Sequence, residues 1–202
     1  MFDFLSAEYV LQAFGMLALF GFVFAESGLF FGFFLPGDSL LFTAGILASK
    51  GFFDFWLILA GTILCAFAGD QVGYLTGKKF GPSFFSKDGS FFRNPKYIRK
   101  ASEFYEKHGK KAIVLARFVP VVRTFAPILA GSAKMDYPTF TLYNAIGGIL
   151  WSCAFLGAGL LLGNVLPSSG EALTLIVLAI IFVSLLPVFC EVWGEYRNRK
   201  KK

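Results

Sequence analysis

The chain has 202 residues, of which 56% are hydrophobic and 16% charged, and its mean hydropathy is +0.65. Soluble domains of this length are not this apolar, so the composition indicates a polytopic membrane protein with a single membrane domain. The net charge of +6 does not indicate a nucleic-acid partner, because the basic residues gather in two clusters beside apolar stretches. Three isolated cysteines and one histidine give no disulfide framework and no metal or cofactor site.

The first apolar region, residues 14–49, is interrupted by two acidic residues, Glu26 and Asp38, and by a Pro36-Gly37 pair. An ionised group at the centre of a bilayer costs about 2.5–3.5 kcal/mol, so such residues indicate a functional site. We expect a re-entrant helical hairpin with its tip near Pro36. One long span over residues 14–35, with Glu26 buried against other helices, is the alternative.

Three segments have the length and apolarity of full membrane spans, which need about 20 apolar residues. Residues 55–77 carry no charge before Asp70, and the stretch that contains the second predicted span, 139–163, is uncharged throughout. The third predicted span is 172–190, and a basic tail, 191–202, follows it.

The segment 112–134 is apolar but contains two arginines and two prolines, and proline disrupts helical hydrogen bonding. Basic clusters flank it at 78–111 and 191–202, and the positive-inside rule places both in the cytoplasm. If 112–134 crossed the membrane, three crossings would separate the two clusters, and one cluster would face outside. If it enters and returns on the same side, two crossings separate them and both clusters stay inside. We therefore expect a second re-entrant hairpin, which would carry Arg117 and Arg123.

The segment 81–111 reads as a cytoplasmic connector between the two halves of the chain. Within it, residues 90–110 alternate aromatic and aliphatic side chains with basic ones at helical spacing. This pattern predicts an amphipathic helix on anionic membrane lipid, with a solvated basic face as the simpler interpretation.

The two halves show weak internal similarity at a constant offset of 86 residues. Each half has a broken hairpin followed by a full span, and one span separates the hairpins. We therefore expect an all-α inverted repeat whose hairpin tips meet near the membrane midplane, with a C-terminal transmembrane helix added. The identities pair Ala44, Gly45, Gly61, Ile63, Leu64, Ala68, Gly73, Leu75 and Gly77 with the residues 86 positions later.

Several spaced motifs resemble the DedA family of bacterial membrane proteins, also called the VTT or SNARE-associated Golgi protein family. The resemblance covers nearly the whole chain. It is carried by Glu26, the Phe34-Leu35-Pro36-Gly37-Asp38-Ser39-Leu40-Leu41 run, Gly69-Asp70-Gln71-Val72-Gly73-Tyr74, Ala116-Arg117-Phe118-Val119-Pro120-Val121-Val122-Arg123-Thr124, Ala130-Gly131, Met135, Asn144, Gly147 and Trp151.

The resemblance implies a multi-pass protein of the bacterial inner membrane with two opposed re-entrant hairpins. It also implies transport that depends on the proton motive force, in support of envelope maintenance. The implied substrate is a recycled, phosphorylated lipid carrier such as undecaprenyl phosphate. Carried over by motif position, the essential residues are Glu26, Asp38, Arg117 and Arg123.

Arginine offers a rigid fork of donors that suits phosphate oxygens and keeps its charge when buried. We expect Arg117 and Arg123 to bind the headgroup, with Glu26 and Asp38 as proton-coupling groups; mutual neutralisation of buried charge is the structural alternative. Secondary candidates are Asp70, Tyr74 and Asn144.

Two other functions stay open, a proton-coupled transporter of small solutes or ions and a non-transport membrane scaffold. We do not expect an enzyme, because hydrolase and metalloprotease motifs are absent from the sequence.

Overall fold

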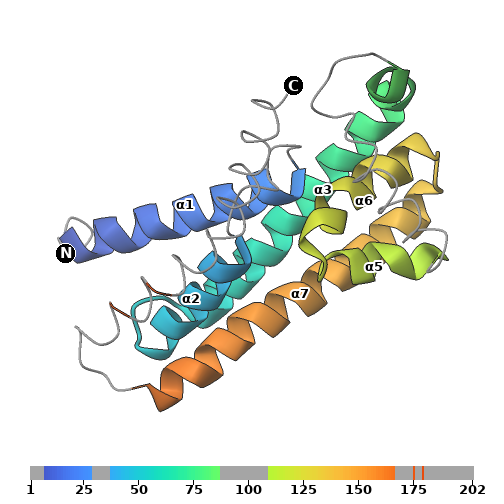
Figure 1. The fold of residues 1–202 in the computed structure, drawn as a ribbon. Helices are drawn as coiled ribbons and strands as arrows, with labels where there is room; N and C mark the ends of the chain where they lie inside the picture. The colour runs from blue at the N-terminus through green and yellow to red at the C-terminus, as the bar shows by residue number, and fades with distance from the viewer. Residues whose placement is uncertain (1–6, 29–36, 87–108, 167–174, 176–178, 180–202) are drawn as a thin grey trace, which may run out of the picture. The chain divides into compact units, whose positions relative to one another are not determined.

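The computed structural model describes residues 7–28, 37–86 and 109–166 and the single positions 175 and 179 (Figure 1). Regular structure in these ranges is entirely helical, as predicted. The helices are α1 (Ala7–Gly28), α2 (Gly37–Ser49), α3 (Phe55–Ser86), the short 3₁₀ helix η4 (Gly109–Lys111), α5 (Ala112–Ala116), α6 (Pro120–Ser132) and α7 (Tyr137–Val165).

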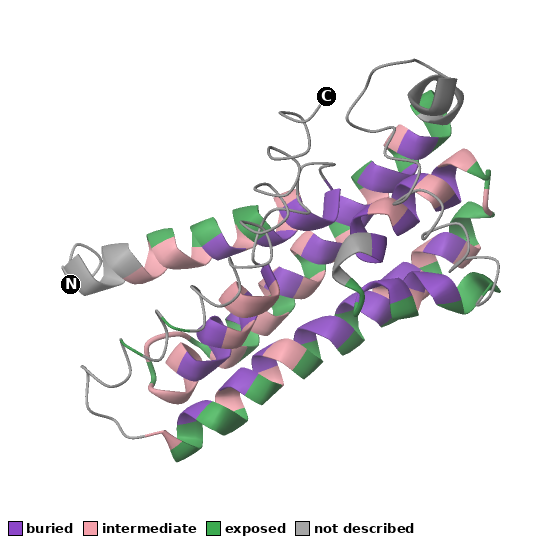
Figure 2. Ribbon diagram, in the orientation of Figure 1, coloured by how far each residue is buried: buried purple, intermediate pink, exposed green. Residues whose placement is uncertain are grey.

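Two stretches, 55–80 of α3 and 137–165 of α7, are long and apolar enough to cross a membrane. Both expose large apolar side chains, with Trp56 73% and Leu161 69% exposed. On α7, buried residues follow one side of the helix and exposed residues the other (Figure 2). Exposed apolar surface on this scale favours contact with lipid.

Several predicted segments differ from the structure or lie outside the described residues. Helix α3 continues past the predicted end at residue 77 to Ser86, because Lys78 and Lys79 end the apolar stretch but are good helix formers. The predicted amphipathic helix at 90–110 lies almost wholly outside the described residues, as do the third span at 172–190, apart from two positions, and the tail at 191–202.

The chain divides into two compact units. The first contains residues 1–35 and 56–154 and the second contains residues 36–55 and 155–202. Helix α1 therefore belongs to the first unit and α2 to the second, and residues 29–36 between them are not described. The re-entrant form of the first hairpin stays a prediction.

In the first unit, α5 and α6 form a helical hairpin whose turn is the segment Arg117–Val119. The two helices pack side by side through a buried cluster of Ala116, Val122 and Ala126. Val119 is extended, with φ −118° and ψ 104°, as expected for a residue that precedes proline. Pro120 then occupies the first turn of α6, where its missing N–H costs nothing. The predicted break is therefore a tight turn between two helices.

Helix α6 also crosses α3 at close range. A Cβ atom on Gly131 would overlap the carbonyl oxygen of Tyr74, and one on Gly77 would overlap that of Ile128. The Tyr74 hydroxyl donates to the Met135 carbonyl oxygen at 2.5 Å, and its ring stacks on Phe140 at 4.5 Å between centroids. These contacts fix the hairpin against α3.

In the second unit, α2 packs on the C-terminal part of α7 in a related way. A Cβ atom on Gly45 would overlap the carbonyl oxygen of Leu156, and one on Gly159 would overlap that of Phe42. Lys50 Nζ donates to the Leu166 carbonyl oxygen at 2.8 Å and so caps the end of α7.

The glycine contacts of the two units match the 86-residue offset on the short helices but not on the long helices. On the short helices, Phe42 and Gly45 occupy the positions of Ile128 and Gly131. On the long helices, the contacts in the second unit are displaced by about one turn, so that Gly159 takes the role that the offset assigns to Gly163. Each unit thus packs a short helix on a long helix through glycine-mediated backbone contact.

The connection from α6 to α7 is a Schellman turn. Lys134 adopts the left-handed conformation with φ 53°, its N–H bonds the Gly131 carbonyl oxygen, and the Met135 N–H bonds that of Ala130. Asp136 then caps α7, and its carboxylate accepts bonds from the Thr139 N–H at 3.1 Å and hydroxyl at 2.8 Å.

Candidate functional site

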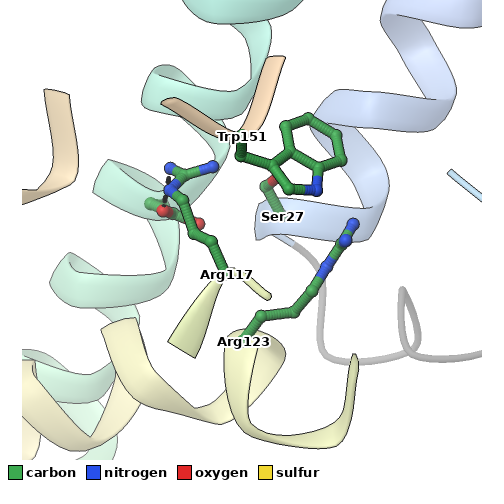
Figure 3. A pocket seen from close by; sticks show the side chains of 5 residues that line it. Ser27, Arg117, Arg123 and Trp151 are labelled. Atoms are coloured by element: carbon green, nitrogen blue, oxygen red, sulfur yellow. Dashed lines mark hydrogen bonds and ion pairs between the residues drawn. The ribbon is translucent and has the colours of Figure 1, made fainter. Parts of the chain in front are cut away.

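The hairpin α5–α6 sends two arginines into the interior of the first unit. Arg117 lies in the turn and Arg123 in the first turns of α6, and they are only 6% and 7% exposed. With Ser27, Asp70 and Trp151 they line one small pocket. Figure 3 shows Trp151 and Ser27 between the two arginine side chains in this view.

Arg117 is held by α3 and α7. Its Nη2 atom makes an ion pair with Asp70 and donates to the Asn144 side-chain oxygen at 2.6 Å and to the Ala66 carbonyl oxygen at 3.4 Å. Asn144 is itself fixed, because its amide donates to the Phe67 carbonyl oxygen at 3.2 Å. The Arg117 Nε atom has no hydrogen-bond partner among the described residues.

Glycines on α7 make room for the Arg117 side chain. A Cβ atom on Gly147 would lie 3.0 Å from Arg117 Cδ and 3.2 Å from its Nε, and one on Gly148 would lie 3.7 Å from Cζ. The Arg117 side chain therefore lies close to the backbone of α7, where larger residues would push it away.

Arg123 has a different environment. Its guanidinium makes an ion pair with Glu26 at 2.5 Å and lies over the Trp151 ring, 4.9 Å from the centroid. A cation over an indole face gains about 0.5–2 kcal/mol. Glu26 is 5% exposed near the end of α1. Close contact of Gly28 with Gly69 sets that end of α1 against α3.

The site therefore contains two buried arginine–carboxylate pairs, and both arginines and Asp70 line one small pocket. Arginine forks bind oxyanions such as phosphate and carboxylate. Chemically, the arrangement is suited to binding an anionic group in exchange for its own carboxylates.

The model of the VTT domain matches residues 35–161, which is more than half of the chain. Protein DedA of Escherichia coli is 44% identical over 190 residues, covering 93% of this chain and 85% of its own. The chain belongs to the DedA family. An uncharacterised membrane protein of Mycobacterium leprae is 45% identical over 179 residues, covering 89% and 80% of the two chains.

A more distant DedA-family relative is the inner membrane protein YqjA of Escherichia coli, 32% identical over 152 residues, which are 74% of this chain and 69% of that protein. No solved structure matches the chain. Family membership and the two apolar helices together assign the protein to a membrane.

The structure brings together four of the residues singled out in the DedA-family motifs: Glu26, Asp70, Arg117 and Arg123. Asn144 joins them through Arg117. Asp70 and Asn144 were only secondary candidates in the sequence, because spacing along α3 and α7 does not indicate which residue contacts which arginine.

Two predicted residues lie elsewhere. Asp38 is half-buried in the first turn of α2, in the second unit. Tyr74 is buried, but its hydroxyl contacts the α6–α7 turn and it does not line the pocket. Trp151 was named from the sequence only as part of the family motifs, and Ser27 was not anticipated as a lining residue. The signal for Trp151 was its spacing of seven from Asn144, which places both on one helix face.

Proposed function

We propose that the protein translocates a phosphorylated lipid carrier, such as undecaprenyl phosphate, across the bacterial inner membrane in a proton-dependent manner. The observation that carries this proposal is the convergence of Arg117 and Arg123, both buried, on one pocket between apolar helices. Buried arginines paired only for neutrality are replaceable by apolar residues at little cost. Their presence here therefore supports binding of an anion.

The surroundings of the pocket favour a lipid over a soluble solute. Both arginines line the pocket, while exposed apolar residues on α3 and α7 offer lipid-facing surface for a hydrocarbon tail. Transport in place of catalysis fits a site of charges without a nucleophile–base pair.

Proton dependence follows from competition within the pocket. While Glu26 is ionised, it holds Arg123 at 2.5 Å. Protonation of Glu26 removes the competing charge and leaves the arginine for the substrate phosphate. Asp38, in the first turn of α2, keeps its predicted proton-coupling role in this proposal.

Membrane topology is part of the proposal. The relative YqjA is named as an inner membrane protein, which supports the same membrane here. The positive-inside rule places the basic segment 78–111 and the tail 191–202, and with it the C-terminus, in the cytoplasm. The matched glycine contacts of α6 on α3 and of α2 on α7 support an inverted repeat with two re-entrant hairpins. We further propose that the segment 90–110 contacts anionic lipid and that 172–190 forms a third span.

The test is translocation in liposomes that contain a polyprenyl phosphate. A membrane-impermeant phosphatase outside the vesicles reports how fast the inner-leaflet phosphate becomes accessible. We expect rapid conversion by the wild type, accelerated by a pH gradient and lost in Arg123→Ala. Lys79→Ala, which removes an exposed cation at the end of the apolar stretch of α3, is the matched control and should retain the wild-type rate.

Failure of a folded wild-type protein to translocate the lipid would contradict the carrier-lipid proposal. The same preparation would then be loaded with small anions, because the arginine pocket would still predict an anionic substrate. Translocation that persists in Arg123→Ala would contradict the assignment of the site.

A further inference from the structure

Among the described residues, the positive and negative charges at the pocket are equal in number. Arg117 pairs with Asp70 and Arg123 with Glu26, and each of these four side chains is between 5% and 7% exposed. Two cations and two anions sum to zero. Uncompensated charge in a buried site is costly, so any anion that enters must be matched by the loss of other negative charge.

A phosphomonoester carries a charge of about −1.5 to −2 near neutral pH, with a second pKa of about 6. Entry of the dianion would leave the pocket with two excess negative charges. Neutralising one carboxylate removes only half of that excess. Neutralising both restores the balance, with the two arginines facing the two charges of the phosphate.

The groups that surround Asp70 limit where the two protons go. Helix α1 contributes Glu26, and the α5–α6 hairpin contributes Arg117 and Arg123, which stay protonated. Helix α7 contributes Asn144 and Trp151, which do not titrate. On α3 itself, Tyr74 lies one turn away with its hydroxyl bonded to Met135. Among the described residues, Asp70 in the pocket lining and Glu26, the partner of Arg123, are thus the groups able to accept a proton.

Arg117 has other hydrogen bonds that can hold its side chain in position when Asp70 is protonated. Its Nη2 atom keeps the bonds to Asn144 and to the Ala66 carbonyl oxygen when Asp70 is neutral. Its Nε atom is buried and has no hydrogen-bond partner among the described residues. Both arginine charges act on Asp70, so its protonation frees positive charge on both sides of the pocket.

We propose that Asp70 is a second proton-binding carboxylate, and that the protein takes up two protons, one on Glu26 and one on Asp70, for each phosphomonoester dianion it binds. This inference rests on the proposed function, because it takes the pocket to be the phosphate site. Both protons come from solution, and both return to it when the carboxylates re-form their arginine pairs on substrate release.

The test uses the full-length protein in detergent and a short-chain alkyl phosphate as the probe. Its dissociation constant is measured between about pH 7 and pH 9, where the probe is a dianion. Two protons taken up on binding weaken the affinity by about 100-fold per pH unit. The wild type should show this slope, and a dialkyl phosphate, which carries one charge, should show about tenfold per unit.

Asp70→Asn should keep the fold, because the amide oxygen still accepts a bond from Arg117. We expect it to bind the alkyl phosphate more tightly than the wild type at the alkaline end, with a slope of about tenfold per pH unit. Glu26→Gln should show the same reduced slope. Asp136→Asn, a matched change at an exposed carboxylate outside the pocket, should keep the wild-type slope.

Three results would overturn the inference. These are a wild-type slope of about tenfold per pH unit, an unchanged slope in Asp70→Asn, or loss of binding in an Asp70→Asn protein whose thermal unfolding matches the wild type. Absence of binding by the folded wild type would instead contradict the proposed function itself, so the two failures are distinguishable.

Discussion

Gly28 and Gly69 bring the backbones of α1 and α3 into direct contact, and a Cβ atom on Gly28 would lie 2.8 Å from the Gly69 Cα atom. The neighbours of this pair in sequence are Ser27 and Asp70, which both line the pocket. The contact therefore sets the distance between the carboxylate of α3 and the end of α1 that carries Glu26.

The first prediction follows from this contact. In Gly69→Ala the added methyl would lie 2.7 Å from the Phe24 carbonyl oxygen and 2.8 Å from Ser27 Cβ, so the helices must separate. We expect a loss of about 1–3 kcal/mol in the free energy of unfolding and a strong fall in transport rate. Gly21→Ala, which meets nothing within 4 Å, is the control on α1 and should be neutral or stabilising. Equal behaviour of the two variants in thermal unfolding would contradict the close contact.

Asn144 positions Arg117 from α7, so its removal should loosen the arginine. Asn144→Ala leaves the Arg117 Nη2 atom without its 2.6 Å acceptor and the Phe67 carbonyl oxygen without its donor. We expect a loss of about 1–3 kcal/mol of stability together with weaker binding of an alkyl phosphate. Asn164→Ala, at an exposed position on the same helix, should change neither quantity. Unaltered phosphate affinity in Asn144→Ala would show that Arg117 does not depend on this bond.

Lys134 carries the left-handed turn between α6 and α7 at φ 53°. A residue with a Cβ atom is destabilised by about 1–2 kcal/mol in this conformation, and glycine is not. We therefore expect Lys134→Gly to raise the free energy of unfolding by up to about 1 kcal/mol. The gain is less than the full strain because glycine also increases the conformational entropy of the unfolded chain. Ala133→Gly, at φ −75°, has no such strain to relieve and should destabilise. The free energies of unfolding of both variants are measured by chemical denaturation and compared with that of the wild type. A destabilised Lys134→Gly would contradict the left-handed turn at this position.

The cap of α7 predicts a pH dependence of stability. The two bonds from Thr139 hold the pKa of the Asp136 carboxyl below its ordinary value. Because the folded-state pKa is depressed, the stabilisation is complete above the ordinary value of about 3.9 and is lost as the pH falls through the folded-state pKa. The melting temperature of Asp136→Ala should therefore lie below that of the wild type at neutral pH, and the gap should narrow in acid. A gap that widens in acid would contradict the cap.

Much of the site was predictable because its residues are expensive in a membrane. Arg117, Arg123 and Glu26 stand out in apolar sequence, and the proline after Val119 marks the turn that carries the arginines. Helix α2 begins at Gly37, within the Pro36-Gly37 pair at which the sequence predicts a hairpin tip. The pairing was not predictable, because partners that lie 47 residues apart, such as Asp70 and Arg117, are chosen by how helices rotate against each other.

The same reasoning explains what sequence analysis left out. Trp151 resembles any buried aromatic until Arg123 is seen over its ring. Gly147 resembles a packing glycine until the Arg117 side chain is seen against it. The left-handed position of a Schellman turn is usually glycine, but here it is Lys134. The local sequence therefore does not predict this turn. These features depend on tertiary contact and not on local preference.

The most direct test of the central claim is whether the two buried arginines bind the phosphate group of a lipid. The measurement compares the affinity of the purified protein for a polyprenyl phosphate with its affinity for the corresponding uncharged polyprenol, in the wild type and in Arg123→Gln. A charge-assisted bond to phosphate contributes about 1.5–3 kcal/mol, so the wild type should prefer the phosphate by at least about tenfold and Arg123→Gln should lose most of that preference. Equal affinity of the wild type for the two lipids would contradict the account.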